Sequence, residues 1–138
     1  MLQVKTVLLS LLILFSGGNL SAQTTQTPLL SDLDIPLMKG FVEEDGSRMV
    51  FDTPQGRIIE VRASGPQRAA QVLDYYRVVL PSLSWVPVAE KSEKSENCDG
   101  MSALCLMARR DGEMLILKIR EIKEPSQKTV IYFSLNPE

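Results

Sequence analysis

The sequence predicts a two-layer α+β domain, in which one amphipathic helix packs on one face of a mainly antiparallel sheet. Residues 64–85 carry apolar side chains at helical spacing. The flanking segments alternate apolar and polar residues between short turns, as antiparallel strands do. Asp111-Gly112 joins two such segments and is a strong hairpin signal. Together these observations predict the element order ββαββββ.

The N-terminus has the layout of a secretory signal peptide. Lys5 precedes the apolar run 7–15, Gly17 and Gly18 end it, and Ala22 supplies a small residue for cleavage. We predict residues 1–22 as the signal peptide and, since the apolar run is too short for a membrane span, no stable membrane insertion after cleavage. An uncleaved anchor is the alternative. Gln23 stands where a lipobox has its cysteine, so no lipid anchor is expected.

The rest of the chain is predicted to be one domain. Residues 23–31 are polar and lack periodicity over most of their length, which predicts a flexible linker, and residues 32–138 form the domain. Residues 32–40 are expected to dock on the domain as an extended or loosely turned segment.

The helix is predicted from its apolar stripe and its end signals. The stripe contains Ala69, Val72, Leu73, Tyr76, Val79 and Leu80. Ser64 is the expected N-cap, Pro66 lies in the first turn, and Pro81 should end the helix.

Six strands are predicted. Segments 49–51 and 57–63 precede the helix and form a hairpin; segments 85–89, 104–108, 114–122 and 129–135 follow it. The side chains expected to face inward are Ile59, Val61, Ala63, Leu115, Leu117, Ile119, Ile131, Phe133 and Leu135. Ile58, Met114 and Ile116 would then share the outer face, where an apolar patch would indicate an interface.

The cysteines Cys98 and Cys105 are the chain's only two thiols. In an exported protein such a pair indicates a disulfide, which would contribute about 2.5 kcal/mol by closing a short loop. A redox pair is an alternative, although the spacing is not C-x-x-C. Another is a soft-metal site for Cu(I) that adds Met101 and Met107. The charged segment 90–99 that contains Cys98 is predicted to be a solvated loop, with a docking loop as the alternative.

Tyr75, Tyr76 and Trp85 are the candidate ligand or interface residues. They seal the contact between helix and sheet in one interpretation, and line an aromatic pocket at the helix end in the other.

Composition excludes several functions. The chain contains no histidine, so Ser-His, Cys-His and His-based zinc sites are ruled out. No sequence motif for a cofactor is present. After loss of the leader the chain has 14 basic and 17 acidic residues, a net charge of −3, and its arginines are scattered. No nucleic-acid partner is therefore expected.

Three segments carry a family resemblance: 34–40 (DIPLMKG), 51–58 (FDTPQGRI) and 75–85 (YYRVVLPSLSW). The chain resembles a family of small uncharacterised exported proteins of proteobacteria with IPxMxG, FDxPxGRI and FYxxxLPxLGW patterns. It departs from them at Tyr75, where Phe is common, and at Ser84, where Gly is usual. The resemblance implies export and one small domain, and it carries over no catalytic residue.

The leading functional hypothesis is a non-enzymatic periplasmic or secreted module that binds an envelope protein or a small ligand. One alternative is a hydrolase or lyase that uses carboxylates such as Asp52 or Glu60, which would need a deep pocket around a carboxylate. A structural subunit of an envelope assembly is the other.

Overall fold

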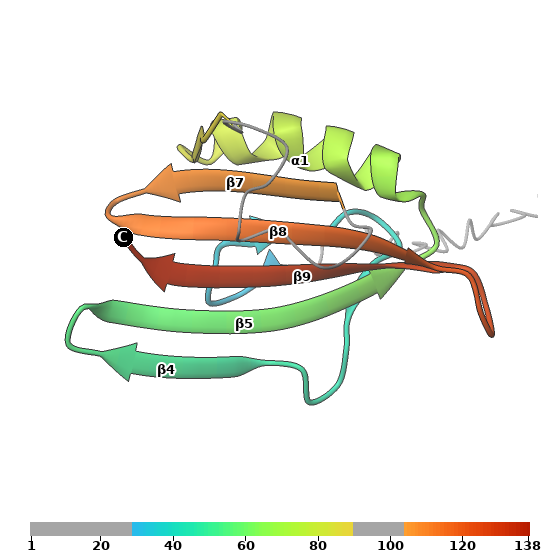
Figure 1. The fold of residues 1–138 in the computed structure, drawn as a ribbon, viewed down its shortest axis with the longest axis horizontal. Coiled ribbons are helices and arrows are strands. Elements are labelled where there is room, and N and C mark those ends of the chain that lie inside the picture. The colour runs from blue at the N-terminus through green and yellow to red at the C-terminus, as the bar shows by residue number, and fades with distance from the viewer. Residues whose placement is uncertain (1–28, 90–103) are drawn as a thin grey trace, which may run out of the picture.

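The computed structural model describes residues 29–89 and 104–138 (Figure 1). Within these ranges the elements are β1 (Leu29–Leu30), β2 (Ile35–Pro36), β3 (Val42–Glu43), β4 (Met49–Thr53), β5 (Gly56–Gly65), α1 (Ala69–Ser82), β6 (Val86–Pro87), β7 (Leu104–Arg110), β8 (Glu113–Ile122) and β9 (Lys128–Pro137). The predicted signal peptide, most of the predicted linker and the charged segment 90–99 lie outside the described residues. The described part contains no helix that is both long and apolar enough to cross a membrane.

The predicted fold class is confirmed. Seven strands form one sheet in the order β3-β5-β9-β8-β7-β6, with β4 also paired to β5, and every pairing is antiparallel. Helix α1, the one helix of the described residues, packs on one face. All six predicted strands are present, and the sequence missed β3 and the separate β1-β2 hairpin because each of these strands has only two residues.

The inward-facing side chains are those that the alternation predicts. The register places Val61 beside Phe133 and Phe133 beside Leu117, and all three are buried. The Asp111-Gly112 turn is also as predicted, since both residues have the positive φ (52° and 79°) that a tight two-residue hairpin requires.

Two parts of the chain pack side by side on the inner face of the sheet: helix α1 and the N-terminal segment that contains β1 and β2. Helix α1 contacts β6, β7 and β8, while β1-β2 lies behind β8 and β9 in the view of Figure 1. Leu30, Leu33, Ile35, Leu37 and Phe41 from this N-terminal segment are buried in the same core cluster as the helix. The segment thus docks as the sequence predicted, and Leu30, which lies in the predicted linker, belongs to the core cluster.

A glycine allows the N-terminal segment to approach β5 closely. A Cβ atom added at Gly65 would lie 2.4 Å from the ring of Phe41. Because Phe41 is itself buried, its ring has no open space into which to move. A side chain at position 65 would therefore displace the segment from the sheet.

The helix begins later than predicted. Ser64 and Gly65 extend β5, where they pair with Val130 and Thr129, so Ser64 is not the N-cap. Arg68 occupies that position, and its N–H donates to Oε1 of Gln71 at 3.1 Å. The carboxylate of Glu121 on β8 accepts from the N–H of Ala69 at 2.9 Å. A negative charge from the sheet thus stabilises the first turn, which local sequence signals could not reveal.

The helix continues past the expected stop at Pro81 and ends at Ser82. Pro81 lies inside the last turn of α1, and Leu83 is the C-cap. Ser84 has φ +66°, its N–H donates to Pro81 O (3.1 Å), and the N–H of Trp85 donates to Leu80 O (3.0 Å). This is the Schellman arrangement, in which glycine is favoured at the left-handed position. Glycine, which is usual at this position in the family that the chain resembles, would adopt this left-handed conformation without strain.

We predict that Ser84→Gly stabilises the protein by about 1 kcal/mol, because glycine adopts positive φ without the Cβ penalty. Urea unfolding of both proteins measures the change. The matched control is Ser82→Gly inside the helix, which should destabilise by about 0.5–1 kcal/mol. Equal effects of the two substitutions would contradict this account of the helix end.

Candidate functional site

The three aromatic candidates lie between the helix and the sheet. Tyr76 and Trp85 are fully buried, and Tyr75 is half-buried. The ring of Tyr76 makes edge-to-face contacts with Phe133 (centroids 5.7 Å apart) and with Tyr75 (4.9 Å). This position is the one expected of side chains that seal the interface, and none of the three lines the groove described below.

Trp85 is held by an arginine from the sheet. The guanidinium of Arg110 lies 4.3 Å from the centre of the Trp85 ring, and its Nη1 donates to the carbonyl of Leu83 at 3.2 Å. The indole N–H of Trp85 is buried without a hydrogen-bond partner in the described part of the chain. Arg110 therefore ties the C-terminal end of α1 to β7 through both a cation–π contact and a hydrogen bond.

Tyr76 connects the helix to the N-terminal segment. Its hydroxyl donates to the carbonyl of Pro36 at 3.2 Å. Burial raises the pKa of Tyr76 well above its ordinary value, so the phenol stays neutral and remains a donor.

We predict that Tyr76→Phe lowers the free energy of unfolding by about 1 kcal/mol, because the Pro36 carbonyl loses its donor while the ring packing is kept. Tyr75→Phe is the matched control and should change stability by less than about 0.5 kcal/mol. Urea unfolding at neutral pH measures both. If both substitutions cost the same, the hydrogen bond to Pro36 contributes nothing.

The two candidate catalytic carboxylates are not brought together. Asp52 on β4 is opposite Arg57, and Glu60 on β5 is opposite Met49, so their side chains lie on opposite faces of the sheet. Both residues are exposed. Arg57 does not pair with the neighbouring Asp52: its Nε donates to Oε1 of Glu113 (2.8 Å) and its Nη1 to the carbonyl of Asp32 (2.9 Å).

The thiol and thioether candidates are described only in part. Cys98 and Met101 lie outside the described residues. Cys105 is half-buried and Met107 buried, both on β7 with side chains on the outer face. Among residues 29–89 and 104–138, no cluster of three or more Cys, Asp or Glu side chains could hold a metal ion. The disulfide, the redox pair and the Cu(I) site stay predictions.

We predict that the exported protein, unfolded without reductant, shows no titratable thiol, because Cys98 and Cys105 are bridged. The double variant with both cysteines replaced by serine should then be less stable by about 2.5 kcal/mol. Two free thiols in the unfolded wild-type protein would refute the bridge.

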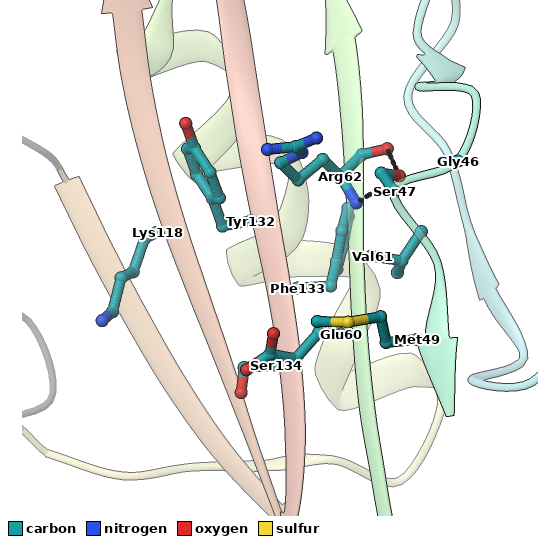
Figure 2. A pocket seen from close by; sticks show the side chains of 10 residues that line it. All are labelled: Gly46, Ser47, Met49, Glu60, Val61, Arg62, Lys118, Tyr132, Phe133 and Ser134. Atoms are coloured by element: carbon teal, nitrogen blue, oxygen red, sulfur yellow. Dashed lines mark hydrogen bonds between the residues drawn. The ribbon is translucent and has the colours of Figure 1, made fainter. Parts of the chain in front are cut away.

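The outer face of the sheet carries an open groove of about 510 Å³. Arg62 on β5, Tyr132 on β9 and Lys118 on β8 are neighbours in one cross-strand row, and Figure 2 shows their side chains on this face. Glu60 and Ser134 lie in the next row and also line the groove. Three adjacent strands thus present polar side chains about 5 Å apart.

A tight loop forms the wall of the groove at the β5 side. The hydroxyl of Ser47 donates to the carbonyl of Arg62 (3.2 Å) and accepts from its N–H (3.1 Å), bonds that are drawn in Figure 2. The carboxylate of Glu44 pairs with Arg62 (3.4 Å) and with Lys128 (3.1 Å). The positive charge of Arg62 is therefore partly neutralised by Glu44 of this loop.

Three further polar side chains of the groove are without a partner among the described residues, while the hydroxyl of Ser134 accepts a hydrogen bond from Asn136 (3.1 Å). In the described part of the chain, the side chains of Lys118, Tyr132 and Glu60 have no ion pair or hydrogen-bond partner. Lys118 supplies a positive charge and Tyr132 a hydroxyl donor from neighbouring strands. Together they can hold an anionic group.

Apolar side chains continue from the groove along the outer face. Ile58, Met114 and Ile116 do share this face, but Ser134 and Asn136 of β9 lie between Ile58 and the two β8 residues. The expected patch is therefore interrupted. The larger exposed apolar area belongs to β4, where Met49, which also lines the groove, is 46% exposed and Phe51 is 56% exposed.

Neither Lys118 nor Tyr132 is a candidate site residue in the sequence alone. The signal was present, since both residues alternate with the inward-facing residues of their strands. They lie close together because the β8-β9 register pairs Lys118 with Tyr132, and the sequence alone does not predict this register.

Comparison with protein-family models, curated proteins and solved structures finds no match for this chain. The family resemblance therefore stays a prediction that rests on the three motif segments.

Proposed function

We propose that the mature protein is a non-enzymatic binding module of the bacterial cell envelope, and that its ligand is an amphipathic anion held on the outer face of the sheet. The leader pattern supports export. One observation carries the binding site: a row of cationic and hydroxyl groups lies beside exposed apolar side chains in one open groove.

The groove suits a ligand with two unlike ends. An acidic head group would pair with Lys118 and accept a hydrogen bond from Tyr132, with Arg62 adding positive charge at the far end of the row. The apolar body would extend toward Met49 and Phe51, whose exposed side chains lose water contact on binding. Glu60, between the two regions, disfavours a second acidic group there.

The setting of the carboxylates favours binding over the hydrolase or lyase alternative. Acid–base catalysis by a pair requires two carboxylates that reach one substrate, and Asp52 and Glu60 face opposite sides of the sheet. Each is exposed rather than enclosed. A structural subunit, the third hypothesis, needs no groove of this kind.

We predict that sodium octanoate shifts the backbone amide resonances of Lys118, Tyr132 and Ser134 in a saturable manner. Lys118→Gln should weaken this binding by about tenfold, the effect of losing one charge-assisted hydrogen bond. Two-dimensional NMR titration of the mature protein measures the affinity. Lys123→Gln, an exposed lysine outside the groove, is the matched control and should bind like the wild type.

Acetate and octanol separate the contributions of the two ends, and each should bind more weakly than octanoate. The proposal is refuted if octanoate leaves the groove resonances unchanged. It is also refuted if both lysine variants bind as well as the wild type, because the anion would then be held elsewhere.

A further inference from the structure

The outer edge of β4 is an unpaired strand edge. In the described part of the chain β4 pairs only with β5. Thr53 and Gly56 flank a two-residue turn and are directly paired, so they exchange both backbone hydrogen bonds. Hydrogen-bonded and non-hydrogen-bonded pairs alternate along an antiparallel ladder, so the backbone groups of Phe51 and Met49 also bond to β5. The N–H and C=O groups of Val50 and Asp52 therefore point outward.

Over residues 49–51 this edge carries no proline or lysine, the residues that often protect a sheet edge. Met49, Val50 and Phe51 are consecutive large apolar residues exposed to 46%, 47% and 56%. Natural edge strands are blunted by short length, proline or lysine. The other end of the sheet follows this rule, since β6 has two residues and one is Pro87. The contrast marks β4 as an edge kept open for another strand.

The charged residues around the β4 edge indicate which kind of strand could pair with it. The stretch from Glu43 to Asp52 carries four carboxylates, on Glu43, Glu44, Asp45 and Asp52, and one cation, Arg48. Arg48 is already neutralised by Glu43 and Asp32. Asp45 and Asp52 are exposed and have no ion pair within the described residues. A second copy of the chain would bring two acidic edges together, which like-charge repulsion disfavours.

We propose that the β4 edge binds an extended segment of another protein, one that alternates apolar and cationic residues, by adding it to the sheet as a further strand. Main-chain hydrogen bonds to Val50 and Asp52 supply affinity. On the outer face the segment's apolar side chains lie beside Met49 and Phe51. On the inner face, which Val50 and Asp52 share, its lysine or arginine side chains pair with Asp52 and cover Val50 with their methylene groups. This strand-addition site borders the anion groove at Met49, but its main-chain hydrogen bonds do not involve the polar side chains of the groove.

The test uses the mature protein and the peptide acetyl-Lys-Val-Lys-Val-Lys-Val-Lys-amide. NMR titration should show saturable shifts centred on β4. Val50→Pro removes the outward N–H without removing a bond to β5, and should weaken binding by about tenfold. Val50→Ala keeps the N–H and is the matched control, with a smaller effect. Lys118→Gln should leave peptide binding unchanged.

Peptide variants test the same contacts with the wild-type protein, so the test does not depend on the folding of a variant. A peptide with Glu in place of Lys should bind at least about tenfold more weakly. Two further peptides carry N-methyl groups, one on all valine backbone nitrogens and the other on all lysine backbone nitrogens. Because alternate residues of an extended strand point their N–H groups to opposite edges, each peptide has lost the hydrogen-bond donors of one edge. Exactly one of these two methylated peptides should lose binding.

Several outcomes would overturn the proposal. These are no shift on β4, equal binding of the Glu peptide, or retained binding by both methylated peptides. Concentration-dependent dimers of the protein alone, abolished by Val50→Pro in sedimentation experiments, would identify a second copy as the occupant instead. Loss of peptide binding in Lys118→Gln would show that the peptide binds in the groove, which would also overturn the proposal.

Discussion

The fold depends on covering the inner face of a seven-stranded sheet, for which the described part of the chain supplies one helix. Helix α1 has 14 residues and contacts the β6, β7 and β8 part of the sheet. The rest of the inner face would meet water if Leu30, Leu33, Ile35, Leu37 and Phe41 did not pack on it. Because each buried large apolar side chain contributes roughly 1.5–3 kcal/mol, this segment is part of the core and not an appendage.

Polar contacts hold that segment in place from two sides. Tyr76 on the helix donates to the Pro36 carbonyl, and Arg57 on β5 donates to the Asp32 carbonyl. Arg57 also pairs with Glu113, so the same side chain connects the segment to β8. Such bonds specify one docking position among many that would bury similar apolar area.

With the inner face committed to the core, function is left to the outer face and to the β4 edge. Among the described residues, the outer face offers polar side chains without partners on adjacent strands, and the edge offers main-chain donors and acceptors beside exposed apolar side chains. The two surfaces meet at Met49, yet they use different chemistry: side-chain charge in the groove and backbone hydrogen bonds at the edge. Both proposed binding sites therefore fit on one small domain.

The sequence by itself determined the fold class, the six longer or better-marked strands, the Asp111-Gly112 turn and the inward rows, because these depend on local periodicity and turn chemistry. Tertiary structure alone decided the rest. Helix α1 starts at Ala69 because Glu121 from β8 meets its first turn, and Arg57 selects Glu113 because β9 brings β8 within reach. Lys118 and Tyr132 form a site only through the β8-β9 register. Contacts between segments distant in sequence leave no periodic signal, so only the folded chain reveals them.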